Sequence, residues 1–275
     1  TGAAIGDALS SHPQVDMISF TGSTRAGVQI AKSAADTVKR ISQELGGKSA
    51  NIVFADSDLE AAITRGVLDC FGNTGQSCNA PTRMLVEASV YDRAVTIAAR
   101  VAKNVKLGAP MEKGPQWGPV VSKMHFDKIQ GLIQIGIDEG AQLIAGGTGR
   151  AIGFDRGYYV KPTVFAGVHN KMTIAQEEVF GPVLVMIPFK DEAEAVEIAN
   201  DTPYGLAAYV QTSDLDRARR VSRQMRAGGA TINGAGQDYA APFGGYKQSG
   251  NGREYGEFGL RDFLEIKVIN GFYAT

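Results

Sequence analysis

Cys78 lies in the segment of the chain best suited to nucleophilic chemistry. Residues 71–83 read FGNTGQSCNAPTR, so this cysteine stands among small and polar residues, where a loop can expose its thiol. The thiolate form of cysteine is a nucleophile, and an attacked carbonyl also needs donors for its developing negative charge. Most isolated cysteines are small buried hydrophobic residues, and we predict that role for Cys70 in its apolar helix. For Cys78 the polar neighbours favour catalysis.

Glu44 is the candidate general base. It follows a strand-like run at 38–42 and precedes Leu45, Gly46 and Gly47, where bare backbone lets a carboxylate swing toward a water molecule. On the local pattern alone, a solvent-exposed turn glutamate is the favoured interpretation.

Four further motifs carry possible chemistry, and each has a simpler alternative. The turn FTGST at 20–24, followed by Gly27, offers free N–H groups and a helix dipole to an anion, but a lone Gly-Ser turn is more often a helix cap. The run EEVFGP at 177–182 could be a surface turn. The run PFGGYKQSG at 242–250 could be a glycine-rich loop with a core phenylalanine, and GRE at 252–254 could contain an ordinary surface ion pair.

The elements that must position these residues alternate between strand-type and helix-type periodicity. This alternation predicts an α/β fold with a mostly parallel sheet and helices on both faces. The expected strands span 15–20, 50–54, 83–86, 183–189, 206–211 and 230–233, and the expected helices span 1–9, 25–39, 58–71, 91–105, 122–139, 192–200 and 215–225. The tail at 263–272 alternates like a final strand with no helix after it, so we expect it to pair with another subunit.

Composition excludes several classes of partner. The 275 residues carry a net charge of -1, which provides no electrostatic footprint for nucleic acid or an anionic membrane. Two cysteines without disulfide or Cys-x-x-Cys spacing favour a reducing, cytoplasmic setting, and we predict no metal site. There is no secretion signal or membrane-spanning apolar run. The chain lacks an initiator methionine and opens inside a helix start, so we expect a fragment of a longer protein.

Taken together, the motifs resemble the NAD(P)-dependent aldehyde dehydrogenase family along the whole chain. The run ELGGKS at 44–49, placed ahead of GQSC at 75–78, is similar to the paired signatures of that family. The resemblance implies oxidation of a small-molecule aldehyde with NAD or NADP. Cys78 would form a thiohemiacetal and then a thioester, Glu44 would activate the hydrolytic water, and Glu254 would relay protons.

The resemblance also implies a set of binding residues. The expected cofactor contacts are Phe20, Gly22, Ser23, Gly27, Leu45, Gly46, Glu178 and Phe180, and the expected substrate contact is Phe243. Within the cofactor set, Glu178 would bind the nicotinamide ribose and Phe180 would border the nicotinamide.

The resemblance further implies three regions and a partner. Residues 1–46 would be the remnant of a dinucleotide-binding domain, 47–248 the catalytic domain, and 249–275 a tail with an oligomerisation strand that forms a homo-dimer or tetramer. The rest of the cofactor domain is absent, and with it the residues that distinguish NAD from NADP. Gln43 departs from the family, which usually has an apolar residue before the glutamate.

Two alternative functions stay open on the sequence. The chain could be a truncated association module without catalysis, or a cofactor-independent thiol esterase that uses Cys78 and Glu44. An intact cysteine and glutamate favour the dehydrogenase, because an association module needs neither. The sequence does not identify the aldehyde, although no basic cluster near residues 237–239 favours a phosphorylated or carboxylated one.

Overall fold

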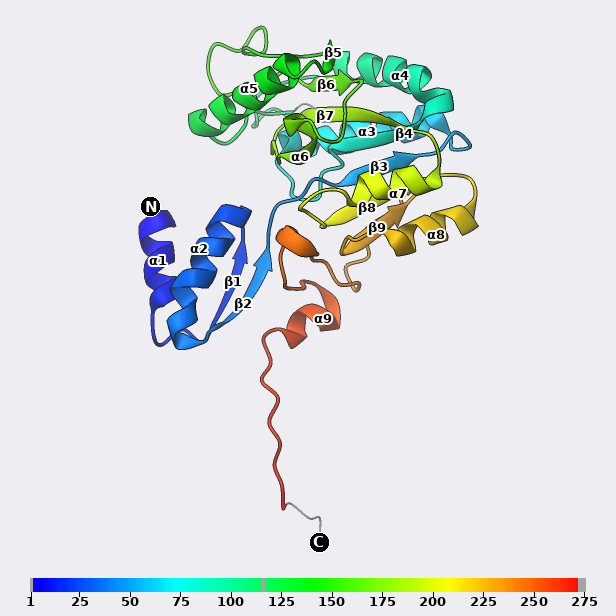
Figure 1. The fold of residues 1–275 in the computed structure, drawn as a ribbon. Coiled ribbons are helices and arrows are strands. Elements are labelled where there is room, and N and C mark those ends of the chain that lie inside the picture. The colour runs from blue at the N-terminus through cyan, green and yellow to red at the C-terminus, as the bar shows by residue number, and fades with distance from the viewer. Residues whose placement is uncertain (1, 115–116, 272–275) are drawn as a thin grey trace.

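The computed structural model describes residues 2–114 and 117–271 and contains two β-sheets (Figure 1). The larger sheet has seven strands in the order β5-β6-β7-β4-β3-β8-β9, and the smaller sheet pairs β1 with β2. Every pair of neighbours is parallel except β5 with β6. The predicted α/β fold with a mostly parallel sheet is confirmed.

The element boundaries are as follows. The strands are β1 (Met17–Thr21), β2 (Arg40–Glu44), β3 (Ala50–Val53), β4 (Arg83–Glu87), β5 (Gln142–Ala145), β6 (Thr163–Ala166), β7 (Val183–Phe189), β8 (Ala207–Gln211) and β9 (Gly229–Ile232). The α-helices are α1 (Gly2–Ser11), α2 (Thr24–Ala34), α3 (Leu59–Phe71), α4 (Tyr91–Lys103), α5 (Lys123–Asp138), α6 (Thr173–Gln176), α7 (Glu192–Asn200), α8 (Leu215–Gln224) and α9 (Gly256–Arg261).

The large sheet is buried on both faces by helices. Leu85 of β4 packs into a cluster with residues of α5, α7 and α8, whereas its neighbours Met84 and Val86 pack into a second cluster with residues of α3 and α4. Successive residues of a strand point to opposite faces, so this alternation separates two cores. Both cores hold the loops at the ends of the strands in place.

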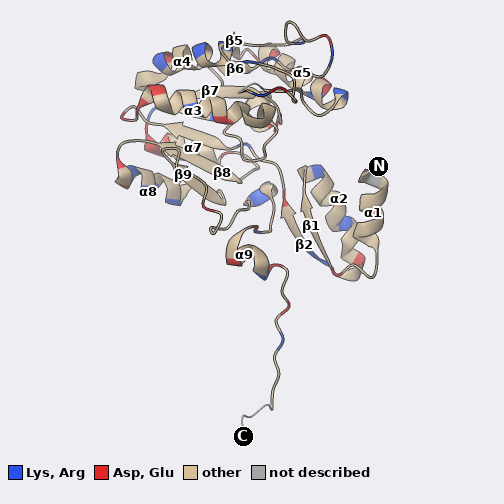
Figure 2. Ribbon diagram, turned by 180° about the vertical axis from the view of Figure 1, so that it is seen from behind, with Lys and Arg blue, Asp and Glu red and all other residues tan. Residues whose placement is uncertain are grey.

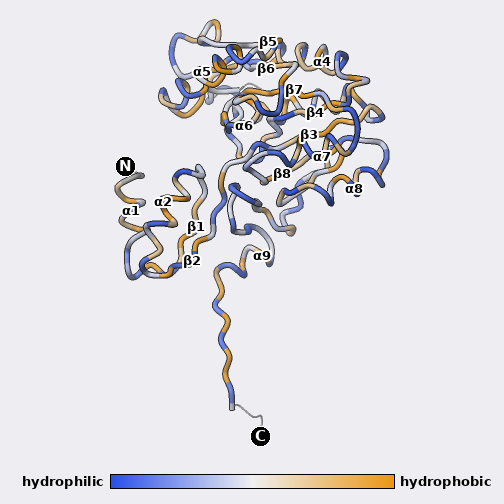
Figure 3. The backbone as a smooth tube through the Cα atoms, viewed as in Figure 1, coloured by the Kyte–Doolittle hydropathy of each residue, from blue (hydrophilic) through white to orange (hydrophobic). Residues whose placement is uncertain are grey.

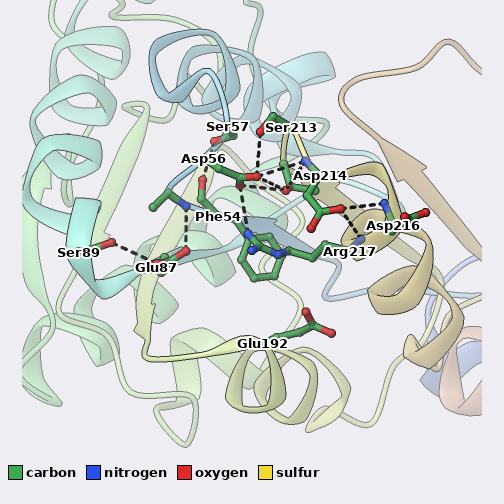
Figure 4. A network of polar contacts seen from close by, with 12 residues as sticks. Phe54, Asp56, Ser57, Glu87, Ser89, Glu192, Ser213, Asp214, Asp216 and Arg217 are labelled. Carbon is green, nitrogen blue, oxygen red and sulfur yellow. Dashed lines mark hydrogen bonds and ion pairs between the residues drawn. The ribbon is translucent and has the colours of Figure 1, made fainter.

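A polar network at the carboxyl ends of β3 and β8 ties these two strands together. Asp56 accepts hydrogen bonds from the hydroxyls of Thr212 and Ser213 and from the backbone N–H of Asp214. Arg217 of α8 pairs with Asp56 at 3.2 Å and lies over the ring of Phe54 (Figure 4). The polar groups at the carboxyl ends of β3 and β8 therefore bind one another within the protein.

The helix predicted for 25–39 is too long. It ends as α2 at Ala34, and Val38 adopts a left-handed backbone with φ 56° and is 90% exposed. The next strand consequently begins at Arg40 rather than at residue 38. The short strands β5 and β6 and the helices α6 and α9 were not predicted, because a four-residue strand carries too little periodicity to separate from a loop.

The tail predicted to be a strand at 263–272 does not form one in the single chain. Residues 264–270 have no secondary structure and leave the body as an extended segment in which polar and apolar positions alternate (Figure 3). Ile266, Val268 and Ile269 are exposed. A strand needs a neighbour for its hydrogen bonds, so pairing of the tail with a partner stays a prediction. Phe272 lies outside the described residues.

Charged residues of both signs are interspersed over the helices, in keeping with the small net charge (Figure 2). Within residues 2–114 and 117–271, no helix has the length and apolar content needed to cross a bilayer.

Candidate active site

Most of the predicted functional residues meet at the amino ends of the strands of the large sheet, opposite to the end that carries the Asp56 network. The segments that precede β3, β4 and β7 converge there on a cavity of about 590 Å³. The lining residues are Thr21, Gly22, Ser23, Glu44, Leu45, Gly46, Gln76, Ser77, Cys78, Asn79, His125, Lys128, Glu178, Phe180, Gln237, Phe243, Glu254 and Tyr255. Open α/β sheets usually bind ligands at the carboxyl ends of their strands. This cavity lies at the amino ends instead, and the loops that precede the strands form it.

Cys78 contributes a half-buried thiol to the cavity. Its loop begins with three consecutive residues at positive φ, Asn73, Thr74 and Gly75, which turn the chain sharply after α3. The carbonyl of Cys78 lies so close to the α-carbon of Gly47 that a side chain there would collide with it. Burial, followed by the nearby charge of Glu44, raises the pKa of the Cys78 thiol.

Cys70 is the contrasting cysteine, as predicted. It is fully buried in α3, its thiol donates weakly to the carbonyl of Val183, and burial raises its pKa to about 12. A group with that pKa stays a neutral thiol at physiological pH.

Glu44 is the last residue of β2 and is only 3% exposed, so the interpretation as a solvent-exposed turn residue is wrong. Neither carboxylate oxygen has a hydrogen-bond partner among the described residues. Burial and the charge of Glu254 raise the pKa of Glu44 to about 8. An unpartnered carboxylate with that pKa can take a proton near neutral pH.

Glu254 is held beside Phe243 by an antiparallel bridge. The two residues exchange backbone hydrogen bonds of 2.8 and 2.7 Å, and both side chains line the cavity. The alternative of a surface ion pair with Arg253 is not realised, since that guanidinium donates to the carbonyls of Gly245 and Gly252. The positive charge of Arg253 favours the ionised carboxylate of Glu44, so it offsets part of the rise in pKa that burial and Glu254 cause.

Most of the predicted cofactor residues reach the same cavity, but two do not. Gly22, Ser23, Leu45, Gly46, Glu178 and Phe180 all line it. Gly27 is buried under the side chain of Leu45, and the ring of Phe20 folds against Gly22, so these two support the turn and do not line the cavity. Ser23 also caps α2 by accepting a 3.3 Å hydrogen bond from the N–H of Ala26.

Glu178 and Phe180 stand on the loop before β7. The Glu178 carboxylate accepts a 2.9 Å hydrogen bond from the N–H of Gly47, and burial raises its pKa. Phe180 has a positive φ of 57°, uncommon for an aromatic residue, which turns its ring toward the cavity.

Sequence analysis missed two residues of α5 that line the cavity, His125 and Lys128. The Nε2 atom of His125 lies 2.6 Å from the carbonyl oxygen of Phe180, and Lys128 donates to the carbonyl of Glu178 at 2.8 Å. Their spacing of three residues places them on one helix face. That spacing was readable in the sequence, but nothing local indicated which face meets the site.

Gln43, the departure from the family pattern, has a structural role. It is 8% exposed, and its side-chain amide donates a 2.7 Å hydrogen bond to the carbonyl of Gly27. This bond satisfies a buried polar group and connects β2 to the helix that carries Ser23.

Comparison with known proteins defines the class to which this site belongs. The model of the aldehyde dehydrogenase family matches residues 1–269, and the chain belongs to that family. The chain is 52% identical over 274 residues to a 3-succinoylsemialdehyde-pyridine dehydrogenase from a Pseudomonas species, with 100% of this chain and 57% of the relative covered. The chain thus spans little more than half the length of that relative.

Solved structures agree with this assignment. The crystal structure of an aldehyde dehydrogenase from Bartonella henselae superposes with a TM-score of 0.94 at 54% identity, covering 96% of this chain and 56% of that one. A mutant of aldehyde dehydrogenase C from Pseudomonas syringae, solved with NAD+ and octanal, gives a TM-score of 0.98 at 48% identity, covering 100% and 57%. A betaine aldehyde dehydrogenase from Staphylococcus aureus, solved with NAD+, gives 0.93 at 38% identity, covering 100% and 56%.

Proposed function

We propose that the complete gene product oxidises an aldehyde to a carboxylic acid with NAD or NADP, and that this chain supplies the nucleophile and the base. One observation carries the proposal: the half-buried thiol of Cys78, in the loop before β4, and the unpartnered buried carboxylate of Glu44, at the end of β2, line one cavity. An unpartnered buried carboxylate costs stability, so Glu44 is not there for the fold.

In the first stage, the Cys78 thiol loses its proton and its sulfur bonds to the aldehyde carbon. Burial raises the pKa of this thiol, but the thiol is only half-buried, so its proton can pass to solvent water. The carbonyl oxygen becomes negative, and the backbone N–H of Cys78 serves as one donor for it. Loss of hydride from the thiohemiacetal carbon leaves a thioester on Cys78.

In the second stage, Glu44 takes a proton from water while the water oxygen attacks the thioester carbon. The carbon–sulfur bond then breaks, which releases the carboxylic acid and restores the cysteine. Glu254 lines the same cavity, and its charge raises the pKa of Glu44. We assign to Glu254 the transfer of the water proton from Glu44 toward solvent.

The residues on the other side of the cavity fit part of a dinucleotide. Ser23 and Gly22 lie at the amino end of α2, where unsatisfied N–H groups and the helix dipole suit a pyrophosphate. The Glu178 carboxylate can accept hydrogen bonds from ribose hydroxyls, and the Phe180 ring offers a flat apolar wall. When bound, the nicotinamide accepts the hydride. Solved relatives that contain NAD+ support this placement.

The decisive experiment measures NAD(P)H formation by the complete gene product. With the wild type we expect aldehyde-dependent absorbance, with Cys78→Ser we expect none above background, and Cys70→Ser is the matched control that should keep turnover. Retention of turnover by Cys78→Ser would contradict the proposal. The thiol esterase is the second candidate on chemistry alone, and it would show as ester hydrolysis without aldehyde oxidation.

The remaining expectations are proposals on the same basis. We propose that the enzyme works in the cytoplasm as a homo-oligomer, and that residues 1–46, 47–248 and 249–275 act as the end of the cofactor domain, the catalytic domain and the association tail. The exposed apolar residues of the tail support the last of these.

A further inference from the structure

A second cavity of about 650 Å³ adjoins the candidate active site. Asn79, Gln237 and Phe243 line both cavities, so the two share a wall next to Cys78. A molecule whose aldehyde carbon reaches the Cys78 sulfur can therefore place its other end in the second cavity. What lines the far end determines which molecules are favoured.

The far end of the second cavity is lined by polar side chains on one face of the large sheet. Asn51 of β3 pairs in register with Tyr209 of β8, and Gln211 lies on the same face two residues further along β8. Asn51 and Gln211 are buried and joined by a 3.0 Å hydrogen bond. The hydroxyl of Tyr209 donates to the carbonyl of Asn79 at 2.9 Å, which connects this polar wall to the residue beside Cys78.

Arg65 of α3 provides the one cation among the described residues that line the second cavity. Its guanidinium donates a 2.6 Å hydrogen bond to the amide oxygen of Gln211, and no ion pair involves it within the described residues. The loop after β9 follows this side chain closely, because a side chain at Gly234 would collide with Nε of Arg65. A guanidinium has five N–H donors, so donors remain for a ligand.

We propose that Arg65 is a specificity-determining residue that donates a hydrogen bond to an uncharged carbonyl group at the far end of the aldehyde substrate. This inference rests on the proposed function and names its substrate class: aldehydes that carry a second, neutral oxygen acceptor, such as a ketone or an ester. The acceptor is neutral because Asp69 and Asp238 also line the cavity. A carboxylate would meet two acidic groups for one guanidinium, whereas a neutral carbonyl accepts the hydrogen bond without that repulsion.

Arg65 and the Cys78 loop contact different positions of β8. Tyr209 donates to Asn79 beside Cys78, and Gln211, two residues further along the strand, accepts from Arg65. The rise between these two strand positions is roughly 7 Å.

The test compares three aldehydes of matched length on the complete gene product: an alkyl aldehyde, the methyl ester of an aldehyde acid, and the free aldehyde acid. We expect the ester to have the lowest KM. Arg65→Leu should raise KM for the ester by about tenfold, the loss of roughly one hydrogen bond, with kcat little changed, and should leave the alkyl aldehyde within about twofold. Arg65→Lys should restore part of the difference. Arg219→Leu, on the exposed face of α8, is the matched control.

A second variant keeps the test informative if Arg65→Leu fails to fold. Asp69→Asn, a substitution at an exposed position of α3, should lower KM for the free acid much more than for the ester. Equal effects of Arg65→Leu on ester and alkyl aldehyde would overturn the proposal, as would a free acid preferred over the ester by the wild type. A wild type that oxidises none of the three would instead count against the proposed function itself.

Discussion

At the scale of single residues, the two cysteines differ in how far their thiols are exposed. Cys78 lies half-buried in a cavity, and Cys70 is fully enclosed with a pKa near 12. We expect iodoacetamide to label Cys78 well before Cys70 in the folded protein. Peptide mapping of the alkylated protein checks this. Because burial also raises the pKa of Cys78, labelling should accelerate as pH rises above neutrality. Modification of Cys70 first, under native conditions, would remove Cys78 as the nucleophile.

Glu44 carries the second prediction at this scale. In the complete gene product, Glu44→Gln should preserve the first burst of NAD(P)H but slow deacylation by roughly a hundredfold or more, the usual cost of losing a general base. In the wild type the deacylation rate should rise with pH toward about 8, since only the deprotonated carboxylate accepts a proton from water. The rise should vanish in the variant. Stopped-flow measurements across pH separate burst from turnover, and a variant that turns over within about twofold of wild type would exclude the role.

The local chemistry was largely predictable, but the environment was not. The loop around Cys78 declares itself by small and polar residues that are adjacent in the chain. The burial of Glu44 depends on residues about two hundred positions later, because Gly250 bridges it and Gly244 lies against its carboxylate. No local pattern contains that information, so the local pattern alone favoured an exposed turn. His125 and Lys128 were missed for the same reason.

At the scale of elements, the segment after β9 joins the two sheets. Ser249 is fully buried: its hydroxyl donates to the carbonyl of Gly46 at 2.6 Å and accepts from the N–H of Gly205 at 2.9 Å. Its own carbonyl accepts a 2.8 Å hydrogen bond from the N–H of Leu45. One serine thus connects the end of β2 to the start of β8.

We expect Ser249→Ala to lower the free energy of unfolding by about 1 to 3 kcal/mol, because it leaves two buried backbone groups without their partner. Ser222→Ala is the matched control, since the buried hydroxyl of Ser222 has no hydrogen-bond partner among the described residues and its removal should cost little. Urea denaturation of both variants gives the comparison. Equal stability of the two variants would show that Ser249 does not hold the sheets together.

The sequence predicts long helices and strands better than short ones. Long amphipathic or apolar segments such as α3, α5 and β7 were placed within two residues at each end. The short pair β5 and β6 was missed, and α2 was extended past Ala34 because the apolar Val38 continued its helical pattern. Val38 is exposed in a left-handed turn, so its hydrophobicity gave the wrong signal there.

At the scale of the whole molecule, the small sheet has only β1 and β2 in the described residues. A two-stranded sheet leaves little surface for a dinucleotide, and two-stranded units are marginal when isolated. We therefore expect the 275-residue chain, expressed alone, to bind NAD(P) weakly and to oxidise no aldehyde at a useful rate. Its exposed tail should cause self-association at micromolar concentration.

Absorbance at saturating aldehyde and sedimentation of the same sample check both parts. A well-behaved monomer with turnover near about one per second or above, the ordinary range for enzymes, would show that the chain is sufficient by itself.

The joint made by Ser249 also has a consequence for heating. Cys78 lies in the loop before β4 of the large sheet and Glu44 ends β2 of the small one. Both buried apolar clusters belong to the large sheet, so the small sheet can open while the large one keeps its cores. Local opening of the smaller unit costs less than global unfolding. A warmed enzyme would then lose the base Glu44 and the Gly22-Ser23 turn together, so aldehyde oxidation would stop while the large sheet stays folded. Parallel measurements of NAD(P)H formation and circular dichroism during heating would show activity lost below the melting temperature.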